Sequence, residues 1–142
     1  MIIKSLELSC FRNYDFLNLE FDRGTNILFG DNAQGKTNIL EAIYLCATTK
    51  SHKGSKDKDI VKFDAQEAHI RSYLEKDGIE RRIDMHLRKN KSKGIAVDQV
   101  RLKKAAELLG LMNVVFFSPE DLSIIKNGPG ERRHFVDMEL CQ

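Results

Sequence analysis

The chain has 142 residues, of which 42% are hydrophobic and 31% are charged. This length corresponds to about one domain, and the mixture excludes a disordered, collagen-like or low-complexity chain. The 23 basic and 21 acidic residues give a net charge of +2. That balance is too even to indicate a nucleic-acid partner by itself, so any such partner must be argued from local charge.

The sequence shows no signal for membrane insertion or secretion. Its most apolar stretch, residues 108–117, is about half as long as the ~20 residues of a membrane-spanning helix. The three cysteines, Cys10, Cys46 and Cys141, are widely separated and include no CxxC pair. Such spacing is typical of reduced thiols rather than of a disulfide framework or a zinc site. We therefore expect a cytoplasmic protein with no membrane partner.

The N-terminal third combines strands with one helix. Alternating polar and apolar residues predict strands over 3–8 and 17–21, joined by an aromatic turn at 10–14. A short third strand is expected over 25–29. From Lys36 onward, apolar residues recur at spacings of three and four, which predicts an amphipathic helix. Its buried face is expected to carry Ile39, Leu40, Ile43, Cys46 and Ala47.

The middle of the chain has the pattern of an antiparallel hairpin. Strands are expected over 68–74 and 79–87, joined at Lys76-Asp77-Gly78. A further turn over 89–94 leads to Ile95-Ala96-Val97.

The remaining elements alternate helix and strand. A helix is predicted over 101–109 with Gly110 as its C-terminal cap. The apolar run 114–117 predicts a strand buried on both faces, and Ser118-Pro119-Glu120 predicts the start of another helix. The mixture indicates an α/β or α+β fold.

The strongest motif is Gly30-Asp31-Asn32-Ala33-Gln34-Gly35-Lys36-Thr37, which satisfies G-x-x-x-x-G-K-[ST]. Its glycines permit backbone angles that a Cβ would block, and successive N–H groups form a nest for phosphate oxygens. The following helix directs its positive end toward the same anion. Asn32 and Gln34 are expected to act through their backbone N–H groups. The motif therefore predicts a nucleoside triphosphate site.

Two residues of this motif have predicted chemical roles. The Lys36 ammonium is expected to reach the β and γ phosphates, and the Thr37 hydroxyl is expected to ligate Mg²⁺. The sequence argues against a GTPase. Its nearest candidate for the guanine-recognition motif N-K-x-D is Asn90-Lys91-Ser92-Lys93, which ends in a cation that cannot accept hydrogen bonds from guanine. A small kinase fits the length, but the sequence has no identifiable arginine-rich lid.

The sequence lacks a recognisable Walker B strand. Residues 114–117 provide the apolar run, but Glu120 and Asp121 follow only after Ser118-Pro119. Two interpretations of these acids remain open. They complement the dipole of the next helix, or Glu120 approaches the metal or the attacking water from the side.

Several blocks of the sequence resemble the RecF family of bacterial DNA-repair ATPases. The first two are Phe11-Arg12-Asn13-Tyr14 and the stretch 32–44, which begins at Asn32 and includes Asn38. The others are Thr48-Thr49-Lys50-Ser51-His52-Lys53, Phe117-Ser118-Pro119-Glu120-Asp121-Leu122, and the stretch 128–137 that contains Gly-Pro-Gly-Glu-Arg-Arg. The blocks occur in the family's order, while residues 59–100 match only in their pattern of strands.

The resemblance implies an α/β P-loop NTPase of the ABC-ATPase and SMC-head type, with a mixed sheet plus antiparallel strands. Such heads bind ATP and Mg²⁺ between two subunits arranged head to tail. The family binds double-stranded DNA near junctions with single strands, hydrolyses ATP slowly, and works with RecO and RecR to load recombinase. The resemblance also implies that Arg12, Asn13 and Asn38 lie close to the nucleotide.

The sequence departs from the family by lacking a signature motif, a Walker B strand and a switch histidine. Residues 1–142 are therefore expected to form the N-terminal portion of an ABC-type head, able to hold ATP without a complete hydrolytic site. Two alternatives remain open: a small P-loop kinase, and a non-enzymatic DNA-binding scaffold whose nucleotide loop is vestigial.

Residues 88–104 carry seven basic side chains and a single acid, Asp98. Basic loops of this kind neutralise DNA phosphates and bind with strong salt dependence, although a solvated charge run is the usual explanation. The resemblance favours DNA contact. The candidate contacts are Lys53, Lys56, Lys89, Lys91 and Lys93.

The histidines and one arginine pair complete the set of candidates. His52, His69, His86 and His134 show no metal-ligand spacing, so surface or structural roles are expected. Arg132 and Arg133 follow a predicted helix start, where cations oppose the helix dipole. Pairing with acids or nucleotide, or a structural salt bridge, would explain them.

Overall fold

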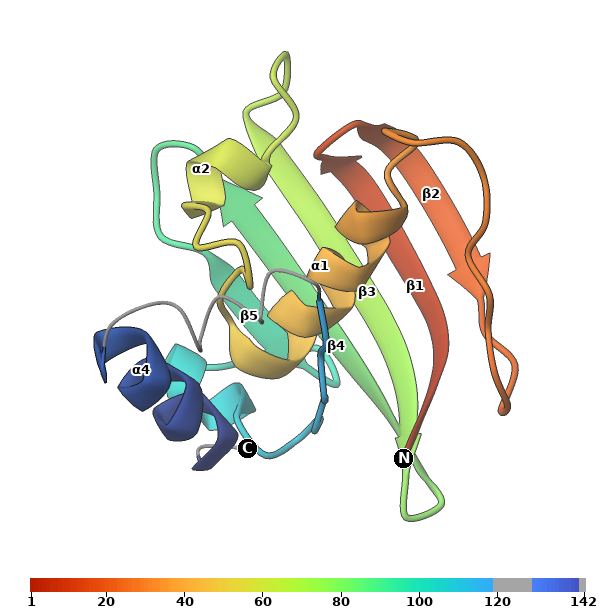
Figure 1. Ribbon diagram of the computed structural model, residues 1–142, viewed down its shortest axis with the longest axis vertical. Helices are drawn as coiled ribbons and strands as arrows, with labels where there is room; N and C mark the ends of the chain where they lie inside the picture. Colours follow the sequence, from red (N-terminus) through yellow and green to blue (C-terminus); the bar gives the residue numbers. More distant parts are fainter. Residues whose placement is uncertain (119–128, 141–142) are drawn as a thin grey trace.

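A computed structural model of the chain describes residues 1–118 and 129–140. Its centre is a six-stranded sheet with the order β2-β1-β3-β4-β5-β6, and α1 lies against one face of that sheet (Figure 1). The strands are β1 (Ile2–Phe11), β2 (Tyr14–Glu20), β3 (Glu67–Lys76), β4 (Ile79–Arg88), β5 (Gly94–Val97) and β6 (Val100–Arg101). The helices are α1 (Lys36–Thr48), α2 (Asp57–Ile60), the short 3₁₀ helix η1 (Ala105–Leu108) and α4 (Pro129–Leu140).

The strands predicted over 3–8, 17–21, 68–74 and 79–87 are confirmed in β1 to β4. The β3–β4 hairpin turns at Asp77-Gly78, whose φ angles of 54° and 77° are both left-handed. An Asp-Gly pair suits such a turn because both central residues need positive φ. The hairpin register pairs residues along its full length, from Lys76 with Ile79 to Glu67 with Arg88.

The hydrophobic core lies between the sheet and α1. Successive strand residues point to opposite faces, so Leu6 and Leu8 of β1 are fully buried beneath the helix. The α1 helix is confirmed, but its buried face is rotated from the expected one. Leu40 is 42% exposed, whereas Glu41 is fully buried. The apolar spacing located the helix correctly and misplaced the centre of its buried face.

Two predicted strands are absent from the described residues. The sheet was expected to be mixed, but every pairing among the described strands is antiparallel. Residues 25–29 and 114–117 form no strand in the structure. Both segments bury one side only: Leu28 and Val114 pack against the core. On the other side, Ile27 is 77% exposed, Phe29 90%, Val115 90% and Phe117 78%. A strand requires a neighbour for its N–H and C=O groups, and an apolar run cannot specify one. The prediction that 114–117 is buried on both faces was wrong.

The predicted helix over 101–109 was also wrong over most of its length. Val100 and Arg101 instead form β6, which pairs with β5 across a turn at Asp98-Gln99. Only the single turn of η1 remains helical. Gly110 follows it with a φ of 81°, the left-handed conformation expected of a residue after a helix end.

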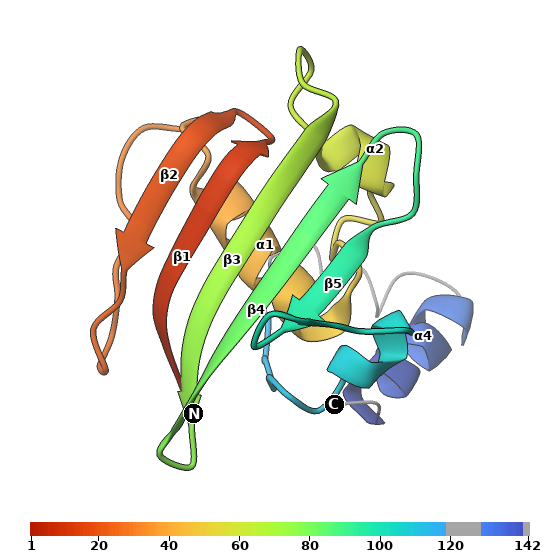
Figure 2. The ribbon, with the colours of Figure 1, turned by 180° about the vertical axis from the view of Figure 1, so that it is seen from behind.

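The C-terminal helix α4 begins at Pro129, which confirms the helix start predicted there. It lies beside η1 in both views (Figures 1 and 2). The helix start predicted at Ser118-Pro119-Glu120 lies outside the described residues beyond Ser118. Glu120, Asp121 and Cys141 also lie outside them. None of the helices formed by the described residues is long and apolar enough to cross a membrane.

Candidate nucleotide site

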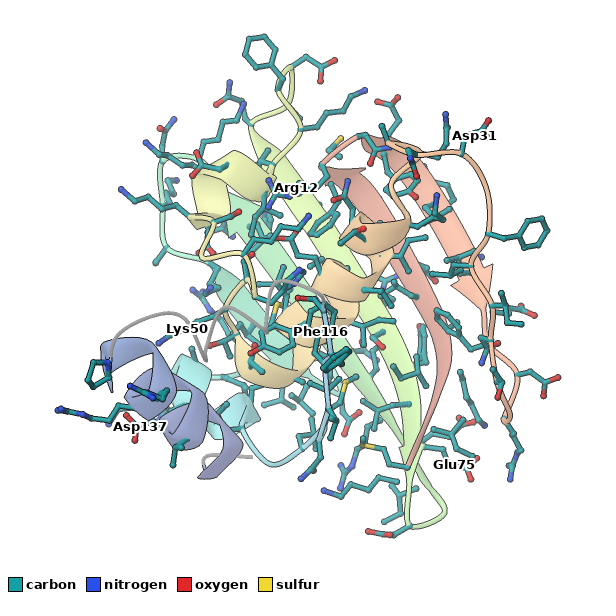
Figure 3. All side chains as sticks on the ribbon, in the orientation of Figure 1. Arg12, Asp31, Lys50, Glu75, Phe116 and Asp137 are labelled. Atoms are coloured by element: carbon teal, nitrogen blue, oxygen red, sulfur yellow. The ribbon has the colours of Figure 1, made fainter. Side chains whose placement is uncertain are left out.

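The phosphate-binding motif forms an exposed loop that leads directly into α1 (Figures 1 and 3). Gly30 and Gly35 adopt φ angles of 139° and 99°. A Cβ on Gly35 would lie 2.5 Å from the Tyr14 hydroxyl and 2.8 Å from the Asn13 amide. Only glycine fits at this position, because the left-handed backbone and the close side chains both exclude a larger residue.

The loop presents its backbone N–H groups to solvent. Among the described residues, no hydrogen bond is donated by the N–H groups of residues 31–37. The first amides turned back into the fold are those of Asn38 and Ile39, which donate to the Gly35 carbonyl at 2.8 and 3.2 Å. Unpaired amides at a helix N-terminus form a positive concavity suited to phosphate oxygens.

The Lys36 side chain folds across this concavity. Its Nζ donates to the carbonyls of Gly30 at 2.7 Å and Asp31 at 2.5 Å. The ammonium therefore already lies over the loop, within a short movement of any group that the amides hold. Thr37 follows in the first turn of α1 and is exposed, so its hydroxyl is accessible to a metal beside a bound phosphate.

Side chains of the β1–β2 turn brace the loop from below. The Asn13 amide and the Tyr14 hydroxyl donate to the Gln34 carbonyl at 3.3 and 3.2 Å. The Asn38 amide donates to the Asn13 side-chain oxygen at 2.9 Å. Burial raises the pKa of Tyr14, so its phenol stays protonated and keeps donating. The resemblance to the RecF family implied that Asn13 and Asn38 lie close to the nucleotide, and it assigned no role to Tyr14.

Arg12 makes a buried ion pair with a residue that the sequence did not single out. Its Nε and Nη2 donate to the two carboxylate oxygens of Glu41 at 2.8 and 2.7 Å. Glu41 is fully buried in α1 and also accepts a hydrogen bond from Ser51. The remaining donors of the guanidinium bind the Ser55 hydroxyl at 2.7 Å and the Asp59 carbonyl at 2.9 Å. In Figure 3, Arg12 lies between α1 and the chain leading into α2.

This ion pair controls the charge of Glu41. Burial raises the pKa of the carboxyl, but the hydrogen bonds from Arg12 and Ser51 and the nearby Lys53 charge outweigh burial and lower it. The carboxyl is therefore an anion at neutral pH, and it holds the guanidinium against α1. We predicted Arg12 as a nucleotide contact, and the structure places its fork on Glu41, beside the turn that braces the loop.

A hollow of about 670 Å³ lies beside Asn13 and Asn38, the residues that contact the loop. Asn13 and Asn38 form its border with the loop, and Phe63 lines it farther along. Its charged lining consists of Arg12, Lys53, Lys58, Asp59 and Lys89. Its volume lies within the usual range for small-molecule sites.

The lysines predicted to contact DNA have different surroundings. Lys53, Lys56 and Lys91 are exposed. Lys93 is engaged within the fold, where its Nζ donates to the Thr49 carbonyl at 2.6 Å and pairs with Asp57 at 2.9 Å. Lys89 donates to the Phe63 carbonyl at 2.8 Å.

The remaining predicted residues do not join this site in the described structure. Glu120 falls outside the described residues, so no geometry bears on its predicted role. Arg132 and Arg133 are exposed on the first turn of α4.

An antiparallel sheet, a helix packed on it and a phosphate-binding motif at the helix start together define a P-loop NTPase fold of the α/β class. The family model for the AAA domain matches residues 5–128. Two curated relatives are similar over the whole chain. The DNA replication and repair protein RecF of Lachnoclostridium phytofermentans is 68% identical, and that of Agathobacter rectalis is 66% identical. In both cases the alignment covers 100% of this chain and 39% of the relative, so the chain spans about two fifths of their length.

Solved structures place the fold in the same group. The recombination mediator protein RecF of the RecFOR pathway, solved with ATP, is 41% identical with a TM-score of 0.91, covering 96% of this chain and 38% of that chain. The SMC head domain from Thermotoga maritima is 19% identical with a TM-score of 0.61, covering 72% and 39%, and supports the fold alone. The chain belongs to the AAA domain family, and over its whole length it is similar to part of the RecF proteins.

Proposed function

We propose that the chain is the ATP-binding part of a RecF-like DNA replication and repair ATPase, and that residues 1–142 form the N-terminal portion of an ABC-type head. The observation that carries the proposal is the loop itself: its amides over 31–37 donate to no described group, and Lys36 lies across them. The identity to RecF proteins and the likeness to a RecF solved with ATP support ATP as the nucleotide.

Each loop residue has a role in this proposal. The backbone of Gly30, Asp31, Asn32, Ala33, Gln34 and Gly35 holds the phosphates, and Asn38 and Asn13 keep the loop in shape. On binding, Lys36 exchanges its two carbonyl acceptors for β- and γ-phosphate oxygens, which form stronger charge-assisted hydrogen bonds. The exposed Thr37 hydroxyl ligates Mg²⁺, an oxygen-seeking cation that bridges the phosphates. The hollow beside the loop accommodates the nucleoside.

The proposal extends to DNA and protein partners. Lys53, Lys56 and Lys91 are exposed near the nucleotide end of the sheet and would contact duplex phosphates, with Lys89 beside them. Double-stranded DNA and its junctions with single strands are the proposed substrates. RecO and RecR are the proposed partners, because the chain's structural relative belongs to the RecFOR pathway. An ATP-dependent head-to-tail dimer would supply the groups that complete ATP hydrolysis.

Equilibrium dialysis with labelled ATP and Mg²⁺ tests the nucleotide assignment. Lys36→Ala removes a charge-assisted contact of about 1.5–3 kcal/mol, so affinity should fall by roughly 10- to 100-fold. Lys103→Ala is the matched control, because Lys103 is exposed and lies outside the loop. Equal affinity of the Lys36→Ala variant and the parent would overturn the assigned geometry. No ATP retained by the parent chain would favour the scaffold with a vestigial loop.

A further inference from the structure

The face of the sheet turned away from α1 carries a compact group of metal-ligand side chains. That face is toward the viewer in Figure 2. The β3–β4 register places His69 directly opposite His86, so two histidines far apart in the sequence become cross-strand neighbours. Glu67 lies two residues before His69, which directs it to the same face. The sequence gave no metal-ligand spacing because the strand register, rather than the spacing, creates the group.

The three side chains converge in the structure. The two imidazole rings stack with their centroids 4.0 Å apart and an interplanar angle of 24°. The Glu67 carboxylate contacts Nε2 of His86. One ligand atom from each residue lies within 4.8 Å of the others. Tetrahedral Zn²⁺, with bonds of about 2.0–2.2 Å, separates its ligand atoms by roughly 3.3 Å. The stacked rings must therefore rotate out of their near-parallel arrangement for both to face one ion.

We propose that Glu67, His69 and His86 bind a divalent cation of the zinc class. Two imidazoles and one carboxylate form a ligand set found in three-ligand zinc sites, which leave one position for water. A hollow of about 390 Å³ lined by both histidines leaves room for that water. The site is separate from the phosphate loop and does not depend on the proposed function.

Arg88 opposes binding and sets its strength. Its Nη2 lies 2.9 Å from Nδ1 of His86, and because arginine only donates, the imidazole proton is on Nε2. Coordination through Nε2 moves that proton to Nδ1, and Arg88 must then turn away. Removal of the guanidinium should therefore strengthen the site.

Zinc titration of the whole chain against a chromophoric chelator tests the site with the metal alone. We expect one Zn²⁺ per chain. His69→Ala and His86→Ala should each weaken binding by at least about tenfold, and Arg88→Gln should tighten it. Glu80→Gln is the matched control, since Glu80 lies at the opposite end of β4. Cys10→Ser removes a competing thiol and should change nothing. Circular dichroism of each variant checks that it is folded.

Cobalt substitution gives a second measurement that does not depend on mutation. Co²⁺ bound by the two imidazoles and the carboxylate should show visible ligand-field bands without thiolate charge-transfer absorption. Zinc binding that is unchanged in the folded His69→Ala and His86→Ala variants would overturn the site. A thiolate band, or no zinc uptake by the parent chain, would do the same.

Discussion

The Arg12–Glu41 pair provides the sharpest test of how the fold supports the loop. Glu41 is fully buried, and Arg12 supplies two of its hydrogen bonds. Arg12→Ala therefore leaves a buried anion with Ser51 as its remaining hydrogen-bond partner. Removal of one member of a buried pair costs about 3–5 kcal/mol of unfolding free energy. Glu41→Gln keeps the shape and removes the charge, with an expected loss of about 1.5–3 kcal/mol.

Urea unfolding of the parent and both variants measures these losses at pH 7. The double variant Arg12→Ala/Glu41→Gln completes a thermodynamic cycle, and we expect a coupling energy of about 1–3 kcal/mol. Lys103→Ala, with an exposed parent side chain, is the control and should lie within about 0.5 kcal/mol of the parent. An Arg12→Ala loss below about 1 kcal/mol would refute the reasoning, because it would mean that the buried carboxylate does not need its partner.

The same pair predicts a direction of pH dependence. The folded-state pKa of Glu41 lies below its ordinary value of 4.5. Its stabilisation is therefore fully present above pH 4.5 and is lost as the pH falls through the lower folded-state pKa. Unfolding free energies of the parent should fall more steeply over this acid range than those of Glu41→Gln. Identical acid slopes in the two proteins would contradict the assigned charge.

Three further predictions concern the loop, the lysines and a thiol. Gly35→Ala should abolish measurable ATP binding in dialysis and cost about 1–3 kcal/mol of stability, whereas Gly24→Ala, whose Cβ meets nothing within 4 Å, should do neither. Charge reversal at Lys89, Lys91 and Lys93 together should weaken duplex DNA binding and flatten its salt dependence. Among the single variants, Lys91→Glu should change the affinity and its salt dependence most cleanly, because Lys93 is paired with Asp57. Fluorescence anisotropy across a salt series measures both quantities. Burial and then the charge of Asp84 raise the pKa of Cys46 to about 12, so iodoacetamide at pH 8 should alkylate it only after unfolding, as mass spectrometry would show.

Local patterns predicted the parts of this fold that depend on local chemistry. Period-two alternation located the long strands, and the Gly-x-x-x-x-Gly-Lys-Thr spacing located the loop and the start of α1. The strand predicted over 114–117 was wrong because an apolar run indicates a preference for burial but does not determine which surface buries it. The helix predicted over 101–109 was wrong at its start because Val100 and Arg101 pair with β5, and this pairing overrode a weak helical pattern.

The candidate sites show the same division. The loop residues could be named from the sequence because their spacing alone creates the phosphate nest. Glu41 could not, since a carboxylate within an apolar helical face has no partner visible in the sequence. The available signal was its position between Ile39 and Ala42, both buried. The pairing of His69 with His86 could not be predicted, because it depends on the register of two strands. Hydrophobic alternation defines that register only to within a slip of two residues.

The uncovered segments at residues 25–29 and 114–117 have a consequence for handling the protein in solution. Extended chain with protruding Ile27, Phe29, Val115 and Phe117 exposes apolar side chains, as do the edge strands that nucleate aggregation. Samples of this chain should accordingly lose monomer as concentration rises. A charged substitution at Phe29 or Phe117 is the rational change for keeping it monodisperse.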